Sequence, residues 1–396
     1  MRQNPTFVIT GKKSVITNLV EIPSPYPDSR LSLAAPPDPA QASGDWIQSG
    51  EQRAMSKPLP KRTPTWGIVA TIAEPAPLVL AFVAHHLALG AREIHLYFDD
   101  PYDPAADILD WIPPAHVTRC DRVYWAGAAP RRPRRQNNRQ SVNATRAQAR
   151  CNVDFLLSCD ADEFLRPGSD VALQLSEIPE AATWMKVFNL ERTMIKGARQ
   201  TTIFDGVFKV HYQGREDTPL RTSELAPFGF TGHAAGKPFV RTRIGMNIGI
   251  HVPRHGHIKD RVVPPHYPAD QIELAHFDGL TPLHWAAKFV RQAANSPEFL
   301  AQLPPFRIAQ WREILGCVND ADALRALYEQ LNGYDPTEIE ALEDDGYITR
   351  DRYDLGPALS AAFPGQTVDL SPEYFDALLR PKVDKWLRKA RKNGVI

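Results

Sequence analysis

Two apolar segments separated by an apolar helix constrain the fold of this chain more than any other feature. Trp66–Thr71 and Glu93–Phe98 are typical of buried strands, and Leu78–Leu89 between them is typical of a helix. Two prolines open this helix, and Gly90 follows it as a C-cap. Strand, helix and strand within about 35 residues form a βαβ unit, whose parallel strands end at one edge of a sheet. The pattern predicts an open α/β sheet.

A third apolar run ends in a group of acids. Phe155–Leu157 continues through Cys159 and is followed at once by Asp160, Asp162 and Glu163. Ligands of open α/β sheets bind at the carboxyl ends of such strands. Carboxylates gathered there repel one another and are costly to bury unless a cation neutralises them. Oxygen ligands at alternate positions suit Mg²⁺ or Mn²⁺. A solvated acidic turn after the strand is the alternative interpretation.

The composition is that of a soluble globular protein. Of 396 residues, 43% are hydrophobic and 23% charged, and the formal net charge of zero gives no general indication of a nucleic-acid partner. The four cysteines lie far apart, so a zinc ribbon or a disulfide framework is not expected. No run reaches the roughly 18 apolar residues of a membrane span, and the N-terminus lacks the apolar core of a signal peptide. We therefore expect a cytoplasmic protein.

The chain divides into three predicted regions. Residues 1–63 form an N-terminal arm, with a hairpin at Thr6–Ile22 and a linker rich in Pro, Ser, Ala and Gly. Residues 64–280 form the α/β domain, and residues 281–396 form a C-terminal helical region. Further predicted elements are a strand at Val117–Val123, a connector at Val171–Ile178, a strand at Thr183–Leu190, and helices at Leu283–Ala293, Phe306–Gly316, Asp320–Leu331 and Pro336–Leu342.

Trp66–Asp103 and Gln136–Pro167 together resemble family 2 glycosyltransferases of the GT-A fold, in the branch that carries the motif D-x-D-E-F. The resemblance implies a Rossmann-like mixed sheet flanked by helices. It also implies the transfer of a sugar, with inversion, from a nucleotide-diphosphate sugar (UDP-linked) to a hydroxyl of a carbohydrate or glycoconjugate, as in surface polysaccharide synthesis. The segments that carry it are Ala73-Glu74, His85-His86, Leu89-Gly90, Ile94–Phe98, Asp99–Asp103 and Asp160–Phe164.

The resemblance assigns two carboxylates to the nucleoside of the donor. Glu74 and Asp99 would accept hydrogen bonds from the uracil and the ribose. The chain departs from the family pattern at Ala73, where the family has Asn, and at Pro101, where it has Ser. Glu74 has an alternative role as an acid at a helix N-terminus, which the helix dipole favours.

The same resemblance implies a metal site. Asp160 and Asp162 would hold Mn²⁺ or Mg²⁺, one of them directly and the other through the ribose or a water molecule. The third ligand would be His276, with His251 as second choice, because an imidazole complements hard carboxylates at Mn²⁺. The metal would bridge the two phosphates of the donor and stabilise the leaving diphosphate. Glu163 is expected to support the strand end instead.

Several basic residues are candidates for contact with the diphosphate. Lys237 and Lys288 could neutralise phosphate charge. The helix predicted at Gln136–Arg150 carries one face of Arg139, Asn143, Arg146 and Arg150. This face is open to three interpretations: a solvated surface, a site for an anionic partner, or donor contact through an arginine such as Arg139. Nucleic acid is not expected, because no aromatic residues for base stacking lie nearby.

Two carboxylates are candidates for the general base that an inverting transfer requires. Asp217 lies in a segment that loosely resembles the family motif E-D-x-x-L, and Glu191 follows the strand Thr183–Leu190. The pair His85-His86 is expected to have a packing role.

The chain ends in a basic amphipathic helix at Tyr374–Lys392. Such a helix can lie on an anionic membrane surface, or it can dock on the protein through its apolar side. Two other function classes remain open. A nucleotidyltransferase would need a glycine-rich phosphate loop, which Thr71–Pro75 lacks. A non-catalytic glycan-binding protein stays open because of the departures at Ala73 and Pro101.

Overall fold

The predicted βαβ unit is present and forms the centre of the sheet. Strand β1 (Trp66–Ile72) leads through helix α1 (Ala76–Ala88) to strand β2 (Glu93–Phe98). The two strands are parallel, and their register is continuous from the pair Gly67–Glu93 to the pair Ile72–Phe98. Gly90 has φ +91°, and its N–H donates to the Leu87 carbonyl at 2.9 Å, so it closes the helix as predicted.

The computed structural model describes residues 62–210, 219–232, 235–255, 263–295, 297–300 and 302–395. All of these belong to the compact unit Leu59–Ile396. The hairpin predicted at Thr6–Ile22 and the linker after it lie outside the described residues. Within the described part of the chain, no helix is both long and apolar enough to cross a bilayer.

Two further parallel strands extend the unit. Strand β3 (Ala115–Arg119) lies beside β2 at the edge of the sheet, and β4 (Phe155–Ser158) lies on the other side of β1. Helix α2 (Pro104–Leu109) connects β2 to β3. The strand predicted at Val117–Val123 is wrong in its second half.

The physical reason for this difference is a helix cap. The Asp121 side chain accepts a hydrogen bond from the Tyr124 N–H at 2.7 Å and begins helix α3 (Arg122–Ala128). A capped helix start fixes the N–H groups that a continued strand would use. Strand β3 therefore ends at Arg119, two residues before the cap at Asp121.

The other half of the sheet contains antiparallel pairs. Strand β8 (Lys237–Arg241) runs antiparallel to β4 and to the long strand β6 (Trp184–Ile195). Strand β11 (Tyr267–His276) is parallel to β6 and antiparallel to β5 (Glu163–Pro167). The sheet is therefore mixed and flanked by helices, as the sequence predicts, and the chain belongs to the α/β class.

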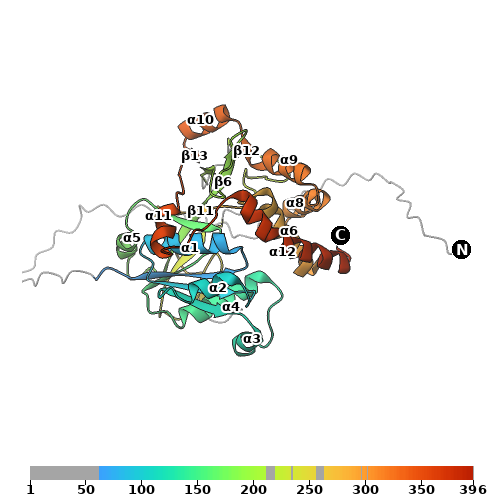
Figure 1. Cartoon of the computed structure of the whole chain (residues 1–396). Coiled ribbons are helices and arrows are strands. Elements are labelled where there is room, and N and C mark those ends of the chain that lie inside the picture. Colours follow the sequence, from blue (N-terminus) through green and yellow to red (C-terminus); the bar gives the residue numbers. More distant parts are fainter. Residues whose placement is uncertain are drawn as a thin grey trace, which may run out of the picture. The chain divides into compact units, whose positions relative to one another are not determined.

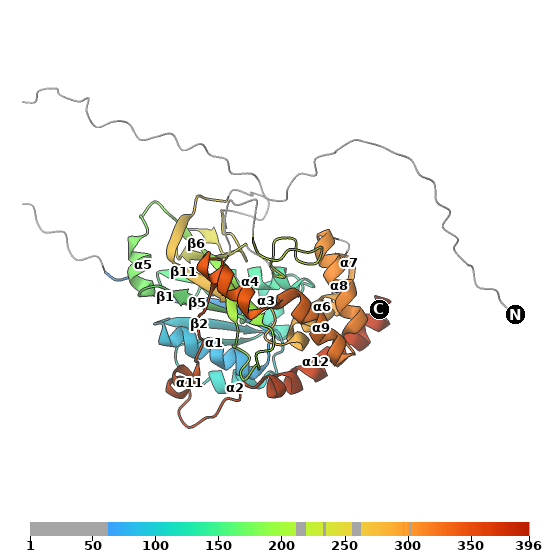
Figure 2. The same cartoon turned by 90° about the horizontal axis from the view of Figure 1, so that it is seen from above.

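Helices cover both faces of the sheet (Figures 1 and 2). Alternate residues of β1, from Trp66 to Ile72, belong to the same hydrophobic cluster as α1, whereas Val69 belongs to a second cluster with α3 and α4 (Gln136–Gln148). This alternation follows from the twofold side-chain period of a strand. Both faces of the central strands are buried, as is typical of a parallel sheet.

The described region after residue 280 is mainly helical, and it also adds strands to the sheet. The two-residue strands β12 and β13 pair with β6 and β7. The remaining elements are α5 (Val171–Glu177), β7 (Val207–Lys209), β9 (Met246–Asn247), β10 (Arg254–His255), α6 (Pro282–Asn295), α7 (Pro297–Leu300), α8 (Pro305–Cys317), α9 (Ala321–Asn332), β12 (Gly333–Tyr334), α10 (Pro336–Asp344), β13 (Ile348–Thr349), α11 (Gly356–Ala362) and α12 (Pro372–Lys392).

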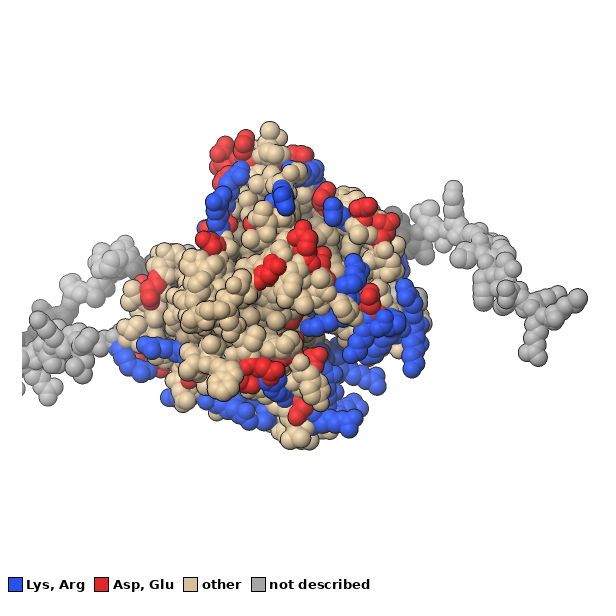
Figure 3. All heavy atoms as spheres, viewed as in Figure 1, with Lys and Arg blue, Asp and Glu red and all other residues tan. Residues whose placement is uncertain are grey.

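The terminal helix α12 docks on the protein through its apolar side. Its buried residues recur every three or four positions, and the helix packs against α6. They are Phe375, Leu379, Val383, Leu387 and Ala390. Figure 3 shows lysine and arginine side chains gathered over the same part of the molecule. Of the two interpretations of this helix, the structure shows docking, and its outward side carries the lysines and arginines together with the exposed Tyr374 and Leu378.

The histidine pair of α1 has the packing role that the sequence predicts. His85 Nε2 lies 2.8 Å from the Leu165 carbonyl oxygen, and the Leu165 N–H donates to His86 Nε2 at 3.2 Å. His86 Nδ1 also lies 2.8 Å from the Phe82 carbonyl. The two imidazoles therefore join helix α1 to strand β5.

This packing predicts a loss of stability in mild acid. Burial lowers the pKa of His85 to about 4, from an ordinary value of 6.5. Between these values the unfolded chain binds a proton that the folded chain does not. Stability therefore falls as the pH drops from about 6.5 to about 4, by up to about 3 kcal/mol, and is unaffected above that window. In urea unfolding, His85→Gln is expected to show a flatter pH profile across the window. An unchanged slope would contradict the assignment.

Candidate functional site

Acidic side chains gather where the parallel strands end. Glu74 follows β1, Asp99 follows β2, and Asp160 follows β4. Because these strands are parallel neighbours, their carboxyl ends lie at one edge of the sheet. Strand β11 brings His276 to the same place, since His276 is paired in register with Glu163. The structure thus brings together residues that the sequence places more than 100 positions apart.

Asp160 lies in a network with Lys237, at the start of β8. Lys237 Nζ lies 2.5 Å from Asp160 Oδ2 and 3.1 Å from Glu163 Oε2, and its side chain is 1% exposed. Gln140, from α4, donates to the other oxygen of Asp160. Burial pushes the pKa of Asp160 up, but Lys237 and nearby imidazoles together outweigh burial and leave it below its ordinary value. Asp160 is therefore held as a carboxylate.

Glu163 supports the strand end, as predicted. Its Oε2 accepts the Asp160 N–H at 2.9 Å, within the turn that joins β4 to β5. The side chain is fully buried, and burial raises its pKa. Glu163 therefore fixes the backbone of Asp160 and does not face the open side of the site.

Asp162 belongs to a second cluster, next to the first. Lys288 Nζ, from α6, lies 2.6 Å from Asp162 Oδ2 and 2.9 Å from Asp278 Oδ1. His276 Nε2 lies 3.8 Å from the same oxygen of Asp162 and 3.9 Å from that of Asp278. Although burial opposes the charged form of Lys288, the two carboxylates raise its pKa above the ordinary value. The ammonium group therefore joins two buried acids beside an imidazole.

Asp278 is a site residue that the sequence interpretation missed. It is 7% exposed, and Thr231 Oγ1 donates to its second carboxylate oxygen at 3.0 Å. Its position two residues after His276, at the end of β11, repeats the spacing of Asp160 and Asp162 after β4. That repeat was the available signal in the sequence.

His251, the second-choice ligand, lies on the Asp160 side of the site. Its Nδ1 is 2.9 Å from the Gly236 carbonyl oxygen, next to Lys237 in the chain. Burial and the charge of Lys237 lower the pKa of His251 to about 4, so the ring is neutral near pH 7. His276 lies within 4 Å of Asp162, on the other side of the site.

Glu191 is buried behind the Asp162 cluster. Its side chain and that of Lys209 are both 0% exposed, and they form an ion pair of 2.9 Å. The N–H groups of Thr231 and Gly232 each donate to the carboxylate at 2.7 Å. A Cβ on Gly232 would lie 2.6 Å from Glu191 Oε2 and 3.0 Å from the His276 ring, so a side chain there would displace the Glu191 carboxylate. This placement suits a positioning residue. Asp217, the other candidate base, lies outside the described residues.

The two carboxylates expected at the nucleoside are each ion-paired. Glu74 lies 3.0 Å from His284 Nε2 and 3.3 Å from Arg291 Nη1, both on α6. Burial raises the pKa of Glu74, but His284 and Arg291 together bring it well below its ordinary value. Asp99 pairs with Arg139 and Arg132, each at 2.8 Å. Each acid thus lies beside basic groups that could contact an anionic ligand.

Helix α4 directs its predicted basic face partly inward. Arg139 is 5% exposed and reaches Asp99, and the buried Asn143 donates to Thr71 Oγ1 at 2.8 Å, at the end of β1. Arg146 donates to the Gly127 carbonyl at 2.8 Å, while Arg150 is exposed. A fully solvated face is therefore excluded for Arg139 and Asn143.

The donor set at Asp162 suits a divalent cation. The carboxylates of Asp162 and Asp278 supply hard oxygen ligands, and His276 supplies a borderline nitrogen within 4 Å of both. In this structure Lys288 provides the positive charge that two buried acids require. A cation bound here would compete with Lys288 for the same oxygens.

Structure comparison aligns the chain with crystal structures of TarS from S. aureus. TarS 1–349 aligns with a TM-score of 0.29 and 12% identity, over 83% of this chain and 88% of that chain. TarS 1–349 in complex with UDP-GlcNAc aligns with a TM-score of 0.30 and 13% identity, over 83% and 89%. No family model matches the chain, and no curated protein matches it significantly.

Proposed function

We propose that this protein is a metal-dependent GT-A glycosyltransferase. It would move a sugar, with inversion, from a UDP-linked donor to a hydroxyl of a carbohydrate or glycoconjugate, in the synthesis of surface polysaccharides or glycoconjugates. One observation supports the proposal: Asp160 and Asp162 follow β4 at the edge where the parallel strands end, and His276, at the end of β11, lies 3.8 Å from Asp162. Ligands of open α/β sheets bind at this edge.

Different residues of the site would contact different parts of the donor. Asp160, Asp162 and His276 would hold Mn²⁺ or Mg²⁺, with Asp278 as an additional carboxylate. The bound ion would supply Lewis-acid stabilisation of the leaving diphosphate. The ammonium groups of Lys237 and Lys288 now pair with carboxylates. With the donor bound, they would also form ion pairs with its phosphates. Each of these lysines already contacts a proposed metal ligand.

Glu74, Asp99 and Arg139 would complete the donor site. The two carboxylates would accept hydrogen bonds from the uracil and the ribose, and Arg139 would turn from Asp99 toward the diphosphate. Asp217 is proposed as the general base, and Glu191 as the residue that positions the loop beside His276. We further propose that the enzyme acts in the cytoplasm, where the charged side of α12 could contact an anionic membrane.

Two alternatives make different predictions. A nucleotidyltransferase would need a backbone phosphate cradle after β1, but Thr71–Pro75 contains no glycine and leads directly into α1. A non-catalytic glycan-binding protein would require no nucleotide at the strand ends. Nucleotide binding is therefore the measurement that separates it from the enzyme.

The test is a calorimetric titration of UDP into the protein with and without Mn²⁺. Wild-type protein is expected to bind UDP more tightly by at least about tenfold when Mn²⁺ is present, a difference of about 1.4 kcal/mol. In Asp162→Ala this dependence on Mn²⁺ is expected to disappear, because the variant lacks a carboxylate that would hold the ion.

The matched control is Glu340→Ala, which removes an exposed carboxylate of α10 far along the chain from the site. It is expected to bind UDP as the wild type does. Equal Mn²⁺-dependent binding by wild type and Asp162→Ala would refute Asp162 as a ligand. If wild type binds no UDP, the same titration with GDP, CDP and dTDP decides between another nucleotide and a non-catalytic protein.

A further inference from the structure

A cluster of metal-ligating side chains lies at the opposite end of the central strands. Glu93 is the first residue of β2, His95 lies two positions on, and His116 lies in β3. His95 and His116 are directly paired in the parallel register, so the two imidazoles project from the same face of the sheet. Asp99 lies six positions after Glu93, or about 20 Å along the strand. The cluster is therefore distinct from the proposed donor site.

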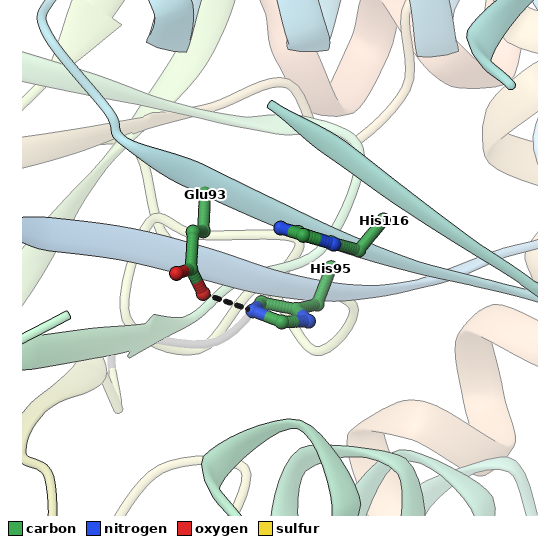
Figure 4. Close-up of side chains that lie close together, drawn as sticks. All are labelled: Glu93, His95 and His116. Atoms are coloured by element: carbon green, nitrogen blue, oxygen red, sulfur yellow. Dashed lines mark hydrogen bonds and ion pairs between the residues drawn. The ribbon is translucent and has the colours of Figure 1, made fainter. Parts of the chain in front are cut away.

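The three side chains converge on one another (Figure 4). Glu93 Oε2 lies 2.9 Å from His95 Nε2, and the rings of His95 and His116 stack with centroids 4.7 Å apart and an interplanar angle of 16°. One ligand atom from each residue lies within 4.8 Å of the other two. Among the described residues, this is the one group of three or more His, Cys, Asp or Glu side chains whose ligand atoms all lie within 4.8 Å of one another.

We propose that Glu93, His95 and His116 form a second metal site, specific for a transition-metal ion of the zinc class. Two imidazoles and one carboxylate are the ligand set of many zinc sites that keep a fourth position for water. Ligands about 2.1 Å from such an ion lie roughly 3.0–3.4 Å apart. The pair Glu93–His95 is already close to this spacing.

His116 would have to rotate for all three to bind, because the stacked rings hold their in-plane nitrogen lone pairs in nearly parallel planes. Its side chain is exposed, whereas His95 is buried at 5% exposure. In the metal-free state His95 Nε2 carries the proton of its hydrogen bond to Glu93. When the ion binds there, the ring changes tautomer, and the proton moves to Nδ1.

Glu93 is held in place by a second contact. The Asn152 N–H donates to its carboxylate, at 3.0 Å to Oε1 and 3.2 Å to Oε2. Such outer contacts orient a ligand and raise metal affinity. Because β3 is the edge strand of the sheet, an ion bound by His95 and His116 would tie this edge to β2.

The test uses the full-length protein and zinc chloride. Zn²⁺ affinity is measured by competition with a chromophoric chelator, and thermal unfolding is followed with and without Zn²⁺. His116→Ala is expected to weaken this binding by more than about 100-fold and to abolish the rise in Tm, since one of three ligands is lost. Because His116 is exposed, the variant should fold. Glu93→Gln is expected to weaken binding as well.

Two comparisons make the result decisive. His266→Ala, which removes another exposed histidine, should bind Zn²⁺ as the wild type does. Asp162→Ala should also retain the site, since it alters only the proposed donor site. Undiminished binding by His116→Ala would overturn the proposal, as would loss of all Zn²⁺ binding in Asp162→Ala. Neither outcome would bear on UDP binding.

Discussion

Lys209→Met is expected to destabilise the protein by about 3–5 kcal/mol, the usual effect of removing one partner of a buried ion pair. Both Lys209 and Glu191 are 0% exposed, and the Lys209 ammonium also donates to the Gly229 carbonyl at 2.7 Å. Without the lysine, Glu191 would remain as a buried carboxylate with no compensating charge. Urea unfolding at pH 7 measures the loss.

The control for Lys209 is an ion pair at the surface. Lys196 lies 3.1 Å from Asp335, and both side chains are more than a third exposed. Lys196→Met should therefore change stability by less than about 1 kcal/mol. In the double variant Lys209→Met with Glu191→Gln, part of the loss should be recovered, because no charge stays buried. A Lys209→Met loss as small as that of Lys196→Met would refute the proposed importance of the pair.

Lys288→Met is expected to make the stability of the protein depend on a divalent cation. In the absence of metal, Asp162 and Asp278 would lose the ammonium between them, at a cost of about 1.5–3 kcal/mol for a hydrogen bond to a charged group. With Mn²⁺ at about 100 times its Kd, binding would restore about 2.7 kcal/mol. Thermal unfolding with and without Mn²⁺ should therefore show a larger Mn²⁺ effect in the variant than in wild type.

The charge-preserving variant separates competition from packing. Lys288→Arg keeps a cation beside the two carboxylates, so its response to Mn²⁺ should resemble that of wild type. Calorimetry should in turn show tighter Mn²⁺ binding by Lys288→Met, since the competing ammonium is gone. If Mn²⁺ stabilises wild type and Lys288→Met equally, the ion and the lysine do not share these oxygens.

The fold could be predicted where the signal is local. Apolar runs, prolines and Gly90 located β1, α1 and β2, because strand burial and helix ends leave marks in a few adjacent residues. The apolar pattern predicts a strand over Val117–Val123, but Asp121 caps a helix within this segment and ends the strand. Strands β12 and β13 could not have been found, since each has two residues and exists only through pairing with a distant strand.

The site could be predicted only in part, for a similar reason. Carboxylates after a buried strand mark the edge at which ligands bind, so Asp160 and Asp162 stand out in the sequence. Their cationic partners do not stand out in the sequence. Lys288 lies 126 positions from Asp162, and the residues around either one give no sign that the two side chains pair. The Glu191–Lys209 pair lies closer in sequence, but its burial depends on the loop at Gly232. Burial and pairing across the fold are tertiary properties.

The placement of Glu74 against α6 bears on how the chain folds as it is synthesised. Glu74 and Arg291 are 217 positions apart, so at translation rates of about 5–20 residues per second their meeting is delayed by roughly 10–40 seconds. The βαβ unit has mainly local contacts and can form well before that. A nascent chain would thus carry a folded βαβ unit in which Glu74 still lacks its partners His284 and Arg291. The ribosome must release the chain through α6 before Glu74 can reach them.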